Sequence, residues 1–124
     1  MEKFNPNQEV KVDYGKEELK DPALTEIISA LDDSNENAQK IKNLDNISLN
    51  CLLDVANRSE VPLEVFLPEI VENEQMSEEF FKLVKEYTEI DKRYNQTTNV
   101  PEREELTAQR KPIVSRFSEM FDLI

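Results

Sequence analysis

Glycine occurs once in the 124 residues, at Gly15, and the chain has one cysteine and no histidine. Phosphate-binding loops need several glycines, because only glycine tolerates positive φ angles and a close backbone approach to a ligand. Zinc sites need clustered cysteines and histidines. Neither kind of site fits this composition, so we expect no cofactor and no metal.

Catalytic patterns are also missing from the sequence. No Gly-x-Ser-x-Gly elbow and no Ser-x-x-Lys pattern places a nucleophile beside a base. Paired carboxylates such as Glu78-Glu79 and Glu104-Glu105 fall on polar helix faces, whereas acid–base catalysis needs a cleft that separates their pKa values. We therefore expect a protein that is not an enzyme and has no catalytic residues.

Apolar residues recur at helical spacing in the first half of the chain. Asp21 is suited to cap a helix that starts at Pro22 and continues to about Leu31. A weaker helical turn follows through residues 38–44, and a stronger helix is expected from residue 45 or 48 to residue 57. Arg58-Ser59-Glu60 is expected to form a turn, and Pro62 starts a short helix that Pro68 should kink or divide.

The last third of the sequence has the most regular pattern. Ser77 is the expected cap of a long helix that ends in a loop at residues 95–99, and Pro101 starts a second helix. Both helices carry an apolar strip with alternating spacings of three and four residues: Phe80, Leu83, Tyr87, Ile90 and Tyr94 in the first, and Leu106, Arg110, Ile113, Phe117, Met120 and Ile124 in the second. These strips predict an antiparallel αα-hairpin, with a kink or a joint at Pro112.

Together these patterns predict an all-α fold. We expect a flexible arm over residues 1–20, although Val10 to Tyr14 alternates like a short strand that adds to a partner's sheet. Residues 21–124 are expected to form one helical domain, with short helices at 21–73 and the helical hairpin at 77–124. Cys51 lies in an apolar helical pattern and is expected to be a small buried hydrophobic residue.

The net charge of −12 is concentrated before residue 77, and Arg58 is the only base from Asn43 to Met76. Such a surface repels phosphate backbones, so direct binding of nucleic acid is disfavoured. Leu52 to Phe66 has the outline of a helix-turn-helix, but its second helix offers acids rather than bases. The acidic face is either a solvated surface or a binding site for a basic protein patch, with Glu60, Glu64 and Glu69 as its candidate residues.

The sequence ends on large apolar residues interleaved with acids, from Ser118 to Ile124. One interpretation is that Phe117, Met120 and Ile124 complete the helical hairpin. The other is a docking peptide that inserts apolar side chains into a partner's pocket while acids meet a basic rim. The candidate partner-binding residues here are Phe117, Met120, Phe121, Asp122, Leu123 and Ile124.

This combination resembles the late-transcription coactivator of T4-type bacteriophages. The resemblance rests on Ser118 to Ile124 as a tail and on Ile47 to Phe66 as part of a helical body. It implies a small acidic helical protein whose body binds the flap of RNA polymerase and whose tail binds the sliding clamp.

We therefore expect an acidic adaptor or regulatory subunit that binds other proteins, with a role in transcription implied by the resemblance. The alternatives are an acidic inhibitor that mimics nucleic acid and a structural subunit of a larger assembly. No apolar run approaches the roughly 18 residues of a membrane span, and the N-terminus lacks a signal-peptide core. The expected location is the cytoplasm, or the nucleus in a eukaryote.

Overall fold

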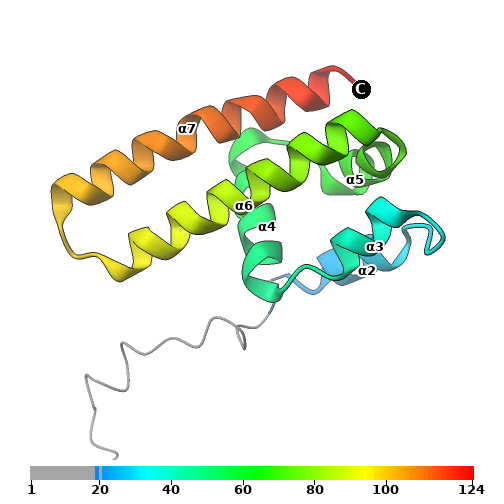
Figure 1. Cartoon of the computed structure of the whole chain (residues 1–124), viewed down its shortest axis with the longest axis horizontal. Coiled ribbons are helices and arrows are strands. Elements are labelled where there is room, and N and C mark those ends of the chain that lie inside the picture. Colours follow the sequence, from blue (N-terminus) through cyan, green and yellow to red (C-terminus); the bar gives the residue numbers. More distant parts are fainter. Residues whose placement is uncertain (1–18, 20) are drawn as a thin grey trace, which may run out of the picture.

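The computed structural model describes residue 19 and residues 21–124, and this part of the chain is all-α. The expected flexible arm, including the alternating segment Val10 to Tyr14, lies outside the described residues except for Leu19, which packs against the core. The helices, shown in Figure 1, are α2 (Ala23–Ser29), α3 (Glu36–Lys42), α4 (Asn46–Ser59), α5 (Leu63–Glu72), α6 (Glu74–Gln96) and α7 (Val100–Asp122).

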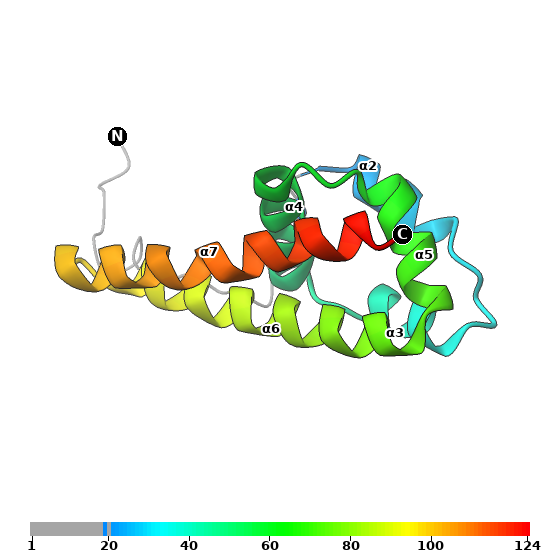
Figure 2. The ribbon, with the colours of Figure 1, turned by 90° about the horizontal axis from the view of Figure 1, so that it is seen from above.

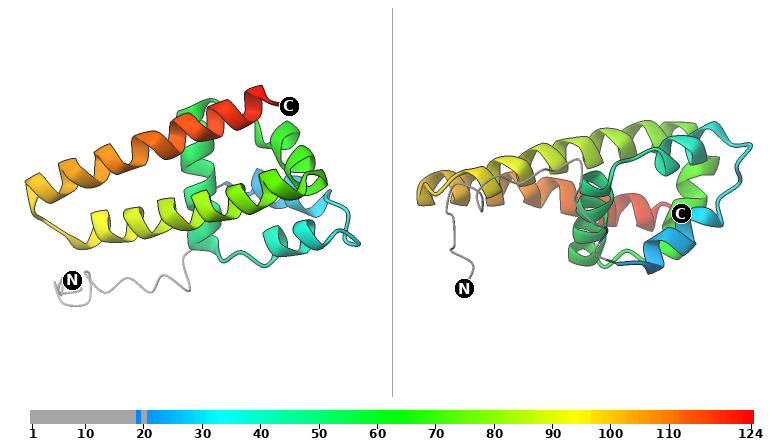
Figure 3. Two further views of the ribbon diagram at one scale, coloured as in Figure 1. Left: turned by 45° about the horizontal axis from the view of Figure 1, so that its top comes forward. Right: turned by 90° about the horizontal axis from the view of Figure 1, so that it is seen from below.

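The predicted antiparallel hairpin is confirmed. Helices α6 and α7 lie side by side, and α4 packs across both near the middle of their length (Figures 1 and 2). The short helices α2, α3 and α5 gather at the end where α6 begins and α7 finishes (Figure 3). The loop between α6 and α7 therefore projects away from the other helices.

Four aromatic side chains with no exposed surface stand at the centre of the core: Phe66, Phe80, Tyr87 and Phe117. The ring of Phe66 on α5 lies 6.1 Å from Phe80 on α6 and 5.7 Å from Phe117 on α7, measured between centroids. Aromatic pairs at such distances contribute beyond the area they bury. These contacts hold α5 at the base of the hairpin.

Ion pairs add to the apolar contact between the two long helices. Arg116 donates from Nε and from an Nη atom to the two carboxylate oxygens of Glu79, at 2.5 and 2.8 Å. This contact with Arg116 lowers the pKa of Glu79, and Glu79 in turn raises the pKa of the guanidinium. Both side chains keep about a third of their surface exposed, so the contribution of the pair to stability is modest.

Two predicted helix boundaries need correction, and two prolines lie inside continuous helices. Helix α6 starts at Glu74 and is capped by Asn73, whose side chain accepts from Met76 N; Ser77 is buried and donates to the carbonyl oxygen of Ile70 instead. The expected turn at Arg58-Ser59-Glu60 is shorter, because α4 continues through Ser59. Pro68 and Pro112 lie inside α5 and α7 and divide neither helix.

Helix α2 starts one residue later than predicted, because Ala23 is its first residue and Pro22, rather than Asp21, holds the capping position without a side-chain bond. Asp21 accepts a hydrogen bond from Ala23 N at 2.9 Å, and Pro22 has helical backbone angles. Cys51 is buried within α4, as its apolar surroundings predicted.

Candidate functional site

The residues predicted to bind a partner near the end of α7 separate into a buried and an exposed group. Phe117 and Met120 have no exposed surface and belong to the core. Phe121 is partly buried, with its ring centroid 6.1 Å from that of Phe66. These three side chains therefore attach the last turns of α7 to α5 and the hairpin.

The next three residues face solvent. Asp122 is exposed, and the exposed fractions of Leu123 and Ile124 are 69% and 44%. Ile124, which the apolar spacing placed in the hairpin strip, is thus not covered as Phe117 and Met120 are. A carboxylate and two large apolar side chains are therefore exposed together where α7 ends.

The acidic candidates Glu60, Glu64 and Glu69 are all exposed. Glu60 ends α4 in the left-handed conformation, with φ 58° and ψ 40°, so its position is set by the turn that reverses the chain into α5. Glu64 lies at the rim of a groove of about 210 Å³ between α2 and α5 that also contains Asp32 and Glu72. Hydrogen bonds from Ser34 lower the pKa of Asp32, so the carboxylate of Asp32 keeps its negative charge to lower pH than an isolated aspartate would.

Helix α5 brings the two sets of candidates to the same end of the molecule. Phe66 of α5 touches Phe121, and the end of α7 lies beside α5 in Figure 2. Val65 on α5 adds a further exposed apolar side chain, with 48% of its surface exposed. An acidic surface with scattered apolar side chains thus occupies this end.

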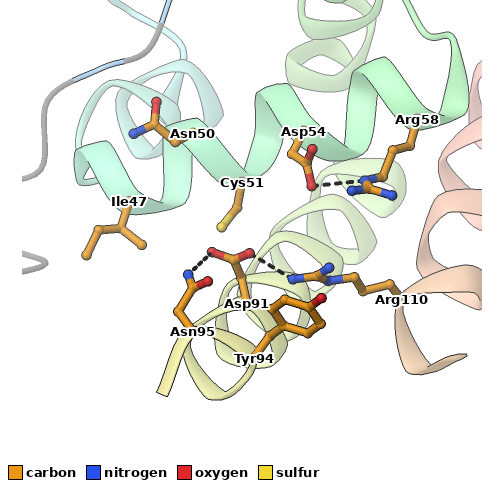
Figure 4. A pocket seen from close by; sticks show the side chains of 9 residues that line it. All are labelled: Ile47, Asn50, Cys51, Asp54, Arg58, Asp91, Tyr94, Asn95 and Arg110. Carbon is orange, nitrogen blue, oxygen red and sulfur yellow. Dashed lines mark hydrogen bonds and ion pairs between the residues drawn. The ribbon is translucent and has the colours of Figure 1, made fainter. Parts of the chain in front are cut away.

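A polar cluster that the sequence analysis did not identify joins α4, α6 and α7. Asp54 on α4 accepts hydrogen bonds from the hydroxyl of Tyr87 and from Nε of Arg58, the second at 3.1 Å. Asp91 on α6 accepts from Arg110 at 2.9 Å and from Asn95 at 3.3 Å (Figure 4). Both carboxylates border one pocket of about 220 Å³ between α4 and the hairpin.

Arg110 is the most buried charge in this cluster, with 10% of its side chain exposed. Its guanidinium carbon lies 4.6 Å from the ring centroid of Tyr94 and 5.6 Å from that of Tyr87. Its Nε atom is buried and makes no hydrogen bond within the described part of the chain. The sequence did carry a signal for this residue, since Arg110 interrupts an otherwise apolar strip.

The chemistry of the cluster favours a structural role. Burial and the hydrogen bond to Asp54 raise the pKa of Tyr87, so its hydroxyl is a weaker acid than that of an ordinary tyrosine and stays protonated at neutral pH. Asp54 and Asp91 are each held by a guanidinium. Among the described residues no group of three or more His, Cys, Asp or Glu side chains is arranged to hold a metal ion.

No known protein family, curated protein or solved structure matches this chain. Among the helices of residues 21–124, none combines the length and the apolar character needed to cross a membrane.

Proposed function

We propose that this protein is a non-catalytic adaptor or regulatory subunit that binds other proteins through the end of α7 and the adjoining acidic surface of α5. One observation carries the proposal: Phe117 and Met120 are fully buried, while Asp122, Leu123 and Ile124 directly after them are exposed. A docking element held by its own core binds with little loss of conformational freedom.

The resemblance to the late-transcription coactivator of T4-type bacteriophages supplies the partners in this proposal. The exposed Leu123 and Ile124 enter an apolar pocket of a sliding clamp, with Asp122 against its basic rim. The helical body binds RNA polymerase, and the adaptor works in the cytoplasm, or in the nucleus of a eukaryotic cell. Apolar anchors surrounded by complementary charge are a common mode of peptide recognition.

The test is titration calorimetry of the full chain with a purified sliding clamp of a T4-type phage. Replacing Leu123 and Ile124 together by serine should weaken binding at least about tenfold, because the apolar anchors are lost. The matched control is Val100→Ser, which removes an exposed apolar side chain (63% exposed) at the other end of α7. Circular dichroism should show both variants folded, and equal affinity of all three proteins would contradict the proposed docking element.

The exposed positions of Glu60, Glu64 and Glu69 favour a second candidate, the acidic inhibitor that mimics nucleic acid. The same titration separates the two functions when it is repeated from low to high salt with RNA polymerase as the partner. Binding by a charge mimic falls steeply with salt and with reversal of these three charges, whereas apolar docking tolerates both.

A further inference from the structure

The middle of α7 differs in charge from the rest of this acidic protein. Between Glu105 and Glu119 the sequence has no acidic residue, and it has three basic ones, Arg110, Lys111 and Arg116. This is the longest stretch without an acid in a chain whose net charge is −12.

The structure places part of this stretch along a trough beside the last turn of α4. The trough has a volume of about 330 Å³, in the size range of small ligand sites. Its lining contains no acidic residue and consists of Arg58, Thr107, Arg110, Lys111, Val114 and Ser115. A hydrogen bond of 3.0 Å from the Ser118 hydroxyl to the carbonyl oxygen of Ser59 holds the two helices together near one end of the trough.

The floor and the rim of the trough differ in chemistry. Val114 is partly buried and packs against the core, so it offers an apolar surface to an incoming side chain. Thr107, Lys111 and Ser115 are exposed and add two hydroxyls and an ammonium group. The carbon stems of arginine and lysine side chains extend such an apolar surface.

The positive charge of the trough is limited in amount. Arg58 is paired with Asp54 and Arg110 with Asp91, while Lys111 has no ion pair in the described part of the chain. One free ammonium and one partly compensated, half-exposed guanidinium match one or two carboxylates. They do not match the run of phosphates in a nucleic acid, which the net negative charge of the protein also repels.

We propose that this trough binds an acidic peptide segment of a partner protein, in which an apolar side chain next to a carboxylate packs against Val114 and the carboxylate pairs with Lys111 and Arg58. The site is distinct from the docking element of the proposed function. Lys111 and Asp122 are separated by three helical turns, or about 16 Å at the rise of an α-helix. The protein therefore offers an acidic and a basic surface to two different segments at once.

The test is fluorescence anisotropy of the full chain with a labelled peptide, Glu-Glu-Leu-Leu-Glu-Leu, together with amide NMR spectra to locate the contact. We expect saturable binding, with shifted resonances at residues 107–115 and Arg58. Lys111→Glu should weaken binding about tenfold, because it places a carboxylate against the carboxylate of the ligand. The matched control is Lys85→Glu, the same charge change at an exposed position on α6.

Three further results would each overturn the proposal. The first is equal binding of the peptide in which glutamine replaces every glutamate. The second is an equal loss of affinity in Lys85→Glu and Lys111→Glu. The third is binding of a labelled twelve-nucleotide oligothymidylate at the trough with no binding of the acidic peptide. The clamp titration is a separate measurement. If the trough does not bind the acidic peptide, the proposed docking element at the end of α7 is unaffected, and a negative clamp titration does not affect the trough.

Discussion

At the scale of single residues, the contact between Tyr87 and Asp54 is the most informative one. Tyr87 has no exposed surface, and its hydroxyl donates to the carboxylate of Asp54 on α4, a residue that lies 33 positions earlier in the chain. Asp54 also accepts from Arg58, so one carboxylate satisfies two donors from different helices. The hydroxyl therefore links the hairpin to the crossing helix.

Replacing Tyr87 by phenylalanine should lower the free energy of unfolding by about 1 kcal/mol, the typical net contribution of one hydrogen bond. The measurement is urea unfolding at pH 8, with Tyr94→Phe as the control, since Tyr94 is partly buried but contacts Arg110 and Arg103 through its ring. A larger loss in the control than in Tyr87→Phe would contradict the assigned role of the hydroxyl.

The stabilisation of the folded protein by the contact between Tyr87 and Asp54 depends on pH. Because the pKa of Tyr87 is raised in the folded protein above the ordinary value of 10.0, the unfolded chain loses this proton first as the pH rises. The stabilisation by Tyr87 is therefore fully present below pH 10 and decreases above it. The difference between the wild type and Tyr87→Phe should shrink in unfolding curves recorded above pH 10.

At the scale of helices, the turn from α4 into α5 depends on an unfavourable backbone conformation. Glu60 is the one non-glycine residue with positive φ among the described residues. Helices commonly end on glycine in this conformation, because a Cβ atom makes it costly. Glu60 therefore occupies a position at which glycine is the usual residue.

Glu60→Gly should raise the free energy of unfolding by roughly 0.5–1 kcal/mol, because it removes the strain of the left-handed residue. The control is Glu86→Gly, at an exposed position inside α6. There glycine should lower the free energy of unfolding by about 1 kcal/mol. Thermal unfolding followed by circular dichroism compares the two. A loss of stability in Glu60→Gly would show that the glutamate side chain stabilises this turn.

At the scale of the whole molecule, Phe66 connects the helices around it. Its ring contacts Phe80 on α6 and both Phe117 and Phe121 on α7. Helix α5, the start of α6 and the end of α7 thus share one buried aromatic cluster. Leu123 and Ile124, the exposed residues of the proposed docking element, lie close to this cluster, since Phe121 is two residues before Leu123.

Phe66→Ala should lower the free energy of unfolding by about 3–5 kcal/mol, the usual cost of truncating a buried phenylalanine. Phe121→Ala should cost less, because Phe121 is only partly buried. Denaturant unfolding of both variants measures the difference. If Phe121→Ala proved the more damaging change, the end of α7 would contribute more to the core than its burial indicates.

The sequence alone determined the helical class, the hairpin and, to within one residue, the start of α2, because these features depend on signals within one or two helical turns. Apolar spacing, caps and prolines act locally. Their effects are seen in the hydrogen bond that Asp21 accepts and in the two long helices α6 and α7. Even so, the local signal at Ser77 misplaced the start of α6, since Asn73 provides the cap and Ser77 bonds to Ile70.

Only the tertiary structure decided which residues near the end of α7 are covered and which polar groups meet. Phe117 and Ile124 fit the same apolar spacing, yet α5 and α6 cover the first and leave the second exposed. The pairing of Asp54 with Tyr87 and of Asp91 with Arg110 depends on how far each helix is rotated and shifted against its neighbour. Rotation and register are set by the packing of the whole core, which no short segment of the sequence contains.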